Sequence, residues 1–337
     1  MGITQKRAGE LLRKFGRRRV LVVGDLMLDR FVYGAVSRIS PEAPVPVVQV
    51  VKETSMPGGA SNVASNLRAL GGRAAVAGMI GKDAAGLELR WLLTHAGVEV
   101  ECAMLFAGAG TIVKERIIAE RQQVVRVDFE RPVAWSPRQS EKFLALLALE
   151  LGRADGVVIE DYGKGTVTQD VVDLILAEAG RRKIPVGLDP KDGHELNLRG
   201  ITVATPNRRE AFAIAGMPDP GAKDDPLADK ALRKAGELLM EKWAAENLAI
   251  TLGPHGMFLM SRGQAPRHVP TRAREVFDVS GAGDTVIAAC VLALASGAAF
   301  HESAELANIA AGVVVGKIGT ASCAPEELLA HMRNLRK

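Results

Sequence analysis

Aromatic residues are scarce in this 337-residue chain, where phenylalanine, tryptophan and tyrosine together make up 4%. The 43 basic side chains are scattered along the sequence, and no aromatic stacking motif interleaves them. Proteins that bind single-stranded nucleic acid combine basic grooves with aromatic platforms. A net charge of +4 suits small anionic substrates equally well. The composition therefore argues against nucleic acid as a partner.

Cysteines and long apolar runs are also few. Cys102, Cys290 and Cys323 are odd in number and lack metal-ligand spacing, which favours reduced thiols over a disulfide framework or a zinc site. No apolar run approaches the ~18 residues that a membrane span requires. The basic N-terminal segment has no apolar signal core. We therefore expect a cytoplasmic protein with no membrane partner.

Two common nucleotide-binding motifs are missing as well. Gly163-Lys164-Gly165 lacks the spacing of a Walker-type phosphate loop. No Gly-x-Gly-x-x-Gly follows the first predicted strand, which argues against a dinucleotide dehydrogenase. The six histidines show no spacing typical of a metal site.

The sequence does contain short apolar runs that alternate with amphipathic stretches, and 47% of its residues are hydrophobic. This alternation predicts an α/β fold, a doubly wound, mainly parallel sheet with helices on both faces. We expect strands at 20–23, 75–79, 156–160, 186–188, 202–205, 248–251 and 257–260. After an amphipathic opening helix, we expect helices at 61–70, 84–96, 137–152, 168–182, 208–214, 226–246, 282–296 and 302–316.

Two segments depart from this alternation. Residues 31–51 contain extended stretches around a proline-rich turn, and residues 111–129 alternate like a hairpin. We expect them to form a small β-sheet lid inserted in a single domain of residues 1–337. Because so small a sheet cannot bury both faces alone, it should serve as a lid or a dimer surface.

The segment Asp278-Val-Ser-Gly-Ala-Gly-Asp284 is the strongest chemical signal. Its small residues let the backbone approach a ligand, and the predicted helix behind it favours anions at its N-terminus. Asp284 is then well placed to take a proton from a hydroxyl that attacks a phosphate. The structural alternative is a glycine-rich turn with Asp284 as a helix cap.

A second group of polar residues follows the first predicted strand. Asp25 and Asp29 emerge at its carboxyl end, where they can accept hydrogen bonds from sugar hydroxyls; Asp25 as a turn cap is the alternative. The pair Gly58-Gly59 permits close backbone approach, and Asn62 offers both a donor and an acceptor.

A third group precedes and follows the predicted strand at 248–251. Asn207 and Glu210 form a capping box, but Glu210 could also hold a magnesium ion through water. The turn Thr251-Leu-Gly253-Pro-His-Gly256 either meets a nucleotide phosphate or is a plain turn between strands.

Together these motifs resemble the ribokinase-like (phosphofructokinase B type) carbohydrate kinases in order and spacing, over nearly the full chain. That resemblance implies a doubly wound domain with a β-sheet lid, and the use of ATP with Mg²⁺. Val279 stands where the family usually has threonine, so a hydroxyl is missing there, while the aspartate and glycines are intact.

Three further stretches resemble the family branch that phosphorylates the anomeric hydroxyl of D-glycero-β-D-manno-heptose 7-phosphate, for ADP-heptose and lipopolysaccharide core biosynthesis. They are Gly24 to Arg30 continuing through Ser37 to Pro46, Lys114 to Asp128, and Asp161-Tyr-Gly-Lys-Gly165. The chain ends at Lys337 without a nucleotidyltransferase motif, so it resembles the stand-alone kinase.

The resemblance assigns roles to the motifs. Asp284 would be the general base, with the amides of Gly281, Ala282 and Gly283 as the anion hole. Nucleotide and magnesium would be held by Asn207, Glu210, Thr251, Gly253 and Gly256. The sugar would be held by Asp25, Asp29, Gly58, Gly59 and Asn62, and its 7-phosphate by Arg38, Lys114, Arg116 and Arg126, for which a solvated lid face is the alternative.

Two alternative functions stay open at this point. The chain could be a kinase for another sugar or sugar phosphate, or a catalytically silent sugar-sensing protein of the same fold. The edges of the lid strands, and the resemblance, also suggest a homodimer that forms through the lid.

Overall fold

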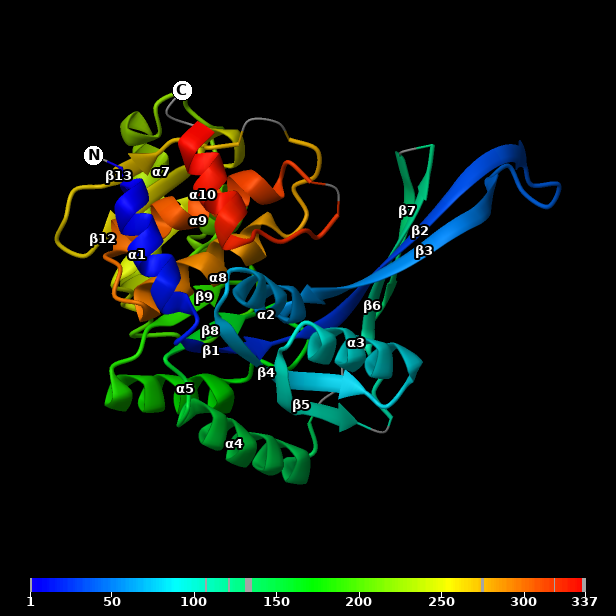
Figure 1. Ribbon diagram of the computed structural model, residues 1–337, viewed down its shortest axis with the longest axis horizontal. Helices are drawn as coiled ribbons and strands as arrows, with labels where there is room; N and C mark the ends of the chain where they lie inside the picture. Colours follow the sequence, from blue (N-terminus) through cyan, green and yellow to red (C-terminus); the bar gives the residue numbers. More distant parts are fainter. Residues whose placement is uncertain are drawn as a thin grey trace.

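The computed structural model describes residues 2–106, 108–120, 122–130, 135–273, 276–317 and 319–334, and shows a large sheet with a smaller one projecting from it (Figure 1). The large sheet has nine strands. In spatial order they are β13 (Arg267–Val269), β12 (Met257–Ser261), β11 (Asn247–Thr251), β10 (Val203–Ala204), β9 (Val186–Asp189), β8 (Gly156–Glu160), β1 (Arg19–Gly24), β4 (Arg73–Gly81) and β5 (Glu99–Phe106).

The strands from β5 to β11 run parallel, and only β12 and β13 pair antiparallel at one edge. The predicted doubly wound, mainly parallel sheet is therefore confirmed. Because parallel strands end at the same edge, the acidic residues at the carboxyl ends of β1, β8 and β9 are brought together there.

Helices cover both faces of the large sheet (Figure 1). In β1, Val20 and Val22 belong to the apolar core on one face, while Leu21 and Val23 belong to the core on the other. The first face carries α1 (Gln5–Phe15), α2 (Ala60–Ala69), α3 (Ala84–His95), α8 (Ala282–Ala295), α9 (Phe300–Val314) and α10 (Pro325–Asn334). The second carries α4 (Pro137–Leu151), α5 (Gln169–Arg182), α6 (Arg208–Ile214) and α7 (Lys230–Trp243).

The smaller sheet is the lid, and its strand order is β3-β2-β6-β7. It consists of β2 (Leu26–Ile39), β3 (Pro46–Gly59), β6 (Ile112–Ala119) and β7 (Gln122–Phe129). These strands extend away from the helical body (Figure 1). β2 and β3 are longer than predicted, since their pairing begins at Leu26 opposite Gly59. The lid is thus rooted beside the carboxyl end of β1.

Several elements differ from those predicted. The helix expected over 226–246 is interrupted after a 3₁₀ turn, η1 (Pro226–Ala228). Asp229 is buried, and its carboxylate accepts the Leu232 N–H at 3.0 Å. Asp229 therefore caps the N-terminus of α7, which begins at Lys230. β5, β13 and α10 were not predicted. A second 3₁₀ turn, η2 (Gly253–His255), joins β11 to β12. Within the described residues, every helix is too short or too polar to cross a bilayer.

Candidate active site

Asp284 lies in the first turn of α8, and its side chain is buried although it carries an ionisable group. Gly281 precedes the helix with φ of 73°, and a Cβ added to it would lie 2.6 Å from the Asn62 amide nitrogen. Glycine is therefore required there both for the turn and for the approach of α2. The positive end of α8 favours the ionised carboxylate and any anion beside it.

The predicted anion hole consists of backbone amides at this helix start. Gly281, Ala282 and Gly283 lie together ahead of Asp284, as the motif predicted. The Ala282 N–H donates to the Val279 carbonyl at 3.2 Å, so it would exchange this bond for one to a phosphoryl oxygen. The anion hole itself stays a prediction.

A chain of side-chain hydrogen bonds orients Asp284. The Asn62 Nδ2 donates to Asp284 Oδ2 at 2.5 Å. Asn66, one turn further along α2, donates to Asn62 Oδ1 at 3.2 Å and accepts from the Thr285 hydroxyl at 2.8 Å. These bonds fix the amide of Asn62 so that its nitrogen faces the carboxylate. Asn66 and Thr285 carried no recognisable sequence signal.

The environment of Asp284 shifts its pKa. Burial raises it to about 6, because the ionised form loses solvation. The Asn62 hydrogen bond lowers it, the Asp29 charge raises it, and the Tyr162 hydroxyl and the Lys114 charge lower it. A carboxylate with a pKa near the operating pH is an effective general base.

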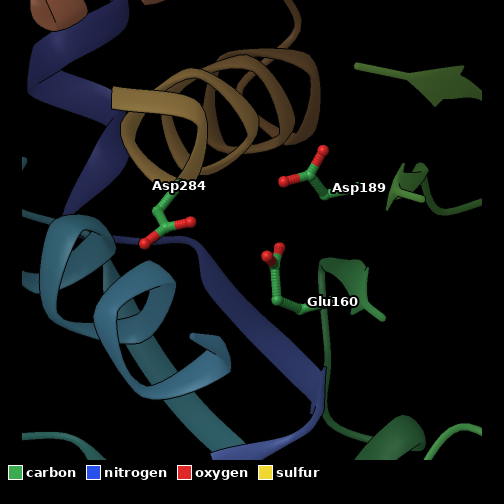
Figure 2. A group of neighbouring side chains, drawn as sticks. All are labelled: Glu160, Asp189 and Asp284. Carbon is green, nitrogen blue, oxygen red and sulfur yellow. The ribbon is translucent and has the colours of Figure 1, made fainter. Parts of the chain in front are cut away.

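Two further carboxylates lie close to Asp284, at the carboxyl ends of neighbouring strands (Figure 2). One oxygen each of Glu160, at the end of β8, Asp189, at the end of β9, and Asp284 lie within 4.8 Å of one another. Burial, and next the Asp189 charge, raise the pKa of Glu160, while burial and next the Glu210 charge raise the pKa of Asp189. Neither residue was predicted, although each ends a buried apolar strand in the sequence.

The carboxylate cluster also bears on magnesium. Glu160 is 1% exposed, and its Oε2 has no hydrogen-bond partner within the described part of the chain. Buried polar atoms are normally satisfied, so an orphaned carboxylate oxygen among other carboxylates fits a hard divalent cation. Glu160, Asp189 and Glu210 thus offer oxygen donors of the type that Mg²⁺ takes.

Asn207 and Glu210 form the capping box of α6. Asn207 Oδ1 accepts the Glu210 N–H at 3.0 Å, and Glu210 Oε2 accepts the Asn207 N–H at 2.9 Å. The capping box that the sequence offered as the structural alternative is therefore formed. It uses Glu210 Oε2, so Oε1 takes no part in it. Burial raises the pKa of Glu210. Asn207 also bridges to Thr251, which joins this motif to the end of β11.

A pocket of about 410 Å³ opens between the end of β11 and the start of α8. Thr251, Gly253 and Gly256 line it, as do Ala282 and Gly283. A Cβ on Gly256, whose φ is 82°, would lie 2.1 Å from the Val269 carbonyl oxygen. The other lining residues are Pro254, Met257, Thr271, Ala273, Val276, Val279, Val286, Asn308, Ala311, Gly312 and Val315. A mainly apolar pocket that ends at a helix N-terminus suits a nucleotide base with its phosphates toward Asp284.

Asp25 has a definite structural task. Its Oδ2 accepts the N–H groups of Tyr162 and Lys164 at 3.1 and 2.9 Å, and its Oδ1 accepts that of Thr166 at 3.1 Å. The carboxylate of Asp25 therefore holds the loop that follows β8. This agrees with the alternative in which Asp25 caps a turn. Contact between Asp25 and a sugar hydroxyl stays a prediction.

Asp29 lies within β2 and faces β6. Arg116 Nη1 lies 2.6 Å from Asp29 Oδ1, and the side chain of Asp29 is 7% exposed. A Cβ on Gly58 would lie 2.7 Å from Asp29 Oδ2, and one on Gly59 would lie 2.9 Å from the Asp25 carbonyl oxygen. The two glycines therefore let β3 pass close to both aspartates, as predicted for a site of close backbone approach.

The four predicted lid cations are not all brought together. Lys114 stands beside Asp29 in the β2–β6 register, and Arg116 and Arg126 are paired across β6 and β7. Arg126 forms a bidentate ion pair with Asp128 at 2.8 and 3.0 Å. Arg38 is exposed near the far end of β2, about 30 Å along the strand from Asp29. Arg38 is therefore not brought next to the other three cations, and the role of all four in holding the 7-phosphate stays a prediction.

Sequence comparison gives a family for this arrangement. Residues 17–327 match the model of the pfkB family of carbohydrate kinases. The bifunctional protein HldE of Gluconacetobacter diazotrophicus is 44% identical over 313 residues, which cover 93% of this chain and 63% of that protein. The HldE of Halorhodospira halophila is 48% identical over 315 residues, again 93% and 63%. The chain therefore spans less than two thirds of the length of these relatives.

Solved structures show the same fold. Arabidopsis thaliana ribokinase, complexed with ribose and ATP, superposes with a TM-score of 0.73 at 19% identity, over 94% of this chain and 98% of that one. Phosphofructokinase-2 from Escherichia coli, in complex with potassium, gives 0.73 at 20% identity, over 95% and 99%. The predicted ribokinase-like fold is confirmed, and the chain belongs to the pfkB family of carbohydrate kinases.

Proposed function

We propose that this kinase transfers the γ-phosphoryl group of ATP to the anomeric hydroxyl of D-glycero-β-D-manno-heptose 7-phosphate, which gives the 1,7-bisphosphate. The observation that carries the proposal is the place of Asp284, a buried carboxylate between an apolar nucleotide pocket and a lid that bears cations. Relatives named HldE at 42–48% identity support heptose phosphate as the sugar, and ADP-heptose synthesis for lipopolysaccharide as the pathway.

In this proposal Asp284 accepts the proton of the sugar C1 hydroxyl while that oxygen attacks the γ-phosphorus and the bond to the ADP oxygen breaks. The amides of Gly281, Ala282 and Gly283 hold the transferring group, whose charge the N-terminus of α8 stabilises. Thr251, Gly253 and Gly256 hold the nucleotide. No covalent intermediate is needed, so positioning and charge stabilisation supply the catalysis.

Cations of the lid hold the 7-phosphate in this scheme. Burial lowers the pKa of Lys114, so a substrate phosphate that pairs with the ammonium favours its charged form. Arg116 and Arg126 lie across β6 and β7 from each other and complete the basic surface. Asp25, Asp29, Gly58, Gly59 and Asn62 line the sugar end.

Magnesium is assigned to the carboxylates beside the nucleotide pocket. Glu210 would hold it through water, and Glu160 and Asp189 offer further oxygen ligands. When bound, Mg²⁺ neutralises phosphate charge and orients the β- and γ-phosphates. The protein's own part is to hold these carboxylates at the ends of adjacent strands.

The lid also supports a homodimer, which we propose forms through its exposed face. The large hydrophobic residues that are exposed on the described part of the lid are Ile39, Val45, Val50, Val51, Val124, Val125, Val127 and Phe129. Such a surface on a projecting sheet is typical of a protein interface. The three free buried cysteines agree with a reducing cytoplasm.

A substrate panel with coupled ADP detection tests the proposed function. Heptose 7-phosphate should give the highest kcat/KM, ahead of ribose, fructose and hexose phosphates. Rapid ADP release with a neutral sugar and none with heptose 7-phosphate would reassign the substrate. If no sugar elicits ADP release, the chain is a sensing protein on a kinase fold.

A further inference from the structure

Tyr162 lies between the lid and Asp284 and contacts both. Its hydroxyl lies 3.4 Å from Asp284 Oδ1, and Lys114 Nζ lies 5.3 Å from the centre of its ring. We infer that Tyr162 is a positioning residue of this kinase, which holds the carboxylate of Asp284 as a second donor and connects it to lid strand β6. The inference deepens the proposed function and rests on Asp284 as the general base.

The two donors on Asp284 occupy different oxygens. Asn62 donates to Oδ2 and Tyr162 to Oδ1, so together they fix the rotation of the carboxylate. The Tyr162 hydroxyl is the donor in its contact, because an ionised carboxylate has only acceptor oxygens. The distance of 3.4 Å between the Tyr162 hydroxyl and Asp284 Oδ1 is longer than an ordinary O–H···O hydrogen bond. Long hydrogen bonds in unliganded active sites commonly shorten when substrate binds.

The loop that carries Tyr162 is rigidly anchored. Asp25, 2% exposed, accepts the Tyr162 N–H and two further amides of the loop, as described above. Asp161, directly before Tyr162, accepts the Gly163 N–H at 2.8 Å and lies 2.7 Å from His194 Nδ1. Two buried carboxylates thus fix the backbone on both sides of Tyr162. This degree of fixation is expected for a residue that aims another side chain.

The ring of Tyr162 joins the lid to this arrangement. Lys114 stands on β6 beside Asp29 of β2, and its ammonium lies over the aromatic face. A cation over an aromatic ring is attracted to its negative face, the more so when partly desolvated. Lys114 contacts the ring of Tyr162, and the hydroxyl of Tyr162 contacts Asp284. Tyr162 therefore connects strand β6 of the lid to Asp284.

Steady-state kinetics of Tyr162→Phe test the inference, with Tyr33→Phe as the matched control. Tyr33, on β2, is the only other tyrosine in the chain. Loss of one hydrogen bond to a charged group should lower kcat about 10-fold. KM for ATP should stay within about 2-fold, because the nucleotide pocket is untouched. A kcat equal to that of Tyr33→Phe would overturn the inference.

A spectroscopic arm separates positioning from a general structural effect. In protein labelled with [¹³Cζ]tyrosine the two signals are assigned by the two Phe variants. Asp284→Asn should shift the Tyr162 signal and leave the Tyr33 signal in place. An unmoved Tyr162 signal would show that the hydroxyl does not contact Asp284 in solution, and would overturn the inference even if Tyr162→Phe loses activity. The NMR measurement needs no sugar. If heptose 7-phosphate proves not to be a substrate, that result contradicts the proposed function but leaves the contact between Tyr162 and Asp284 to be tested by NMR.

Discussion

Asn62 donates its side-chain amide proton to Asp284 over 2.5 Å, although 222 residues separate the two in the sequence. The bond joins the first turn of α2 to the first turn of α8, where Gly281 leaves room for it. Both helices therefore present their N-termini to one point. The geometry of the base depends on this contact between distant segments.

Asn62→Ala removes the shorter of the two bonds to Asp284. Hydrogen bonds to charged groups contribute about 1.5–3 kcal/mol, so we expect kcat to fall roughly 10–100-fold. Steady-state kinetics with ATP and sugar check this, with the exposed Asn197→Ala as the control. Equal kcat values for the two variants would show that Asp284 needs no partner from α2.

Asp284→Asn removes the base and also relieves a buried charge. Turnover should fall roughly 10²–10⁴-fold, while ATP affinity by calorimetry stays near that of the wild type. The folded pKa of about 6 lies above the unfolded value, so the stability contributed by this group is complete below about pH 4 and is lost as pH rises through 6. The variant should therefore melt a few degrees higher at pH 7.5. A lower melting temperature would mean that the ionised carboxylate is well satisfied.

The pH dependence of catalysis follows from the same shift. The base acts only when ionised, and burial raises the pKa of Asp284 to about 6. We expect kcat/KM to be level above about pH 7 and to fall about tenfold per pH unit below 6. Rates measured from pH 5 to 8 in buffers of constant ionic strength check this. A profile that stays level down to pH 5 would contradict the role of a buried base.

Lys114→Met tests the cation next to Asp29. Loss of a charge-assisted contact to a phosphate should raise KM for the phosphorylated sugar about 10–100-fold and leave KM for ATP little changed. The control is Lys52→Met, an exposed cation on β3 of the same lid. If both variants raise KM alike, the lid acts through its overall charge rather than through Lys114.

Glu160→Gln tests the carboxylate cluster. The substitution keeps the shape and replaces one of three neighbouring carboxylates by a neutral amide. The magnesium concentration for half-maximal activity should rise about 10-fold, and Mn²⁺ binding observed by electron paramagnetic resonance should weaken by a similar factor. Unchanged Mn²⁺ binding would place the metal away from Glu160.

The sequence predicts much of the body of this fold because the parallel strands are short buried apolar runs between amphipathic helices. The prediction fails where a single side chain sets a helix boundary. The buried Asp229 is such a case, because it ends η1 and caps the start of α7. The prediction also misses β5, which lies at the edge of the sheet, begins at Glu99 and has Glu101 between apolar residues.

The site was predicted in the same uneven way. Asp284 and Asn62 stand in glycine-rich motifs. Such motifs indicate a tight turn or a close backbone approach even in a single sequence. Glu160 and Asp189 stand in no such motif, and Tyr162 belongs to Asp161-Tyr-Gly-Lys-Gly165, in which the sequence assigned it no role. The proximity of these three residues to Asp284 depends on strand order, with β8 placed between β1 and β9. Strand order is a property of the tertiary fold. The position of Arg38 was not predictable for a related reason, since it depends on the length of β2, which places Arg38 far along the strand from Asp29.

Phosphorus NMR of the product made from heptose 7-phosphate and ATP tests whether Asp284 drives phosphoryl transfer to the anomeric hydroxyl. We expect a second phosphate signal, coupled to the anomeric proton, that grows with wild-type protein and is nearly absent with Asp284→Asn. A new phosphate at another carbon, or equal product with both proteins, would contradict it.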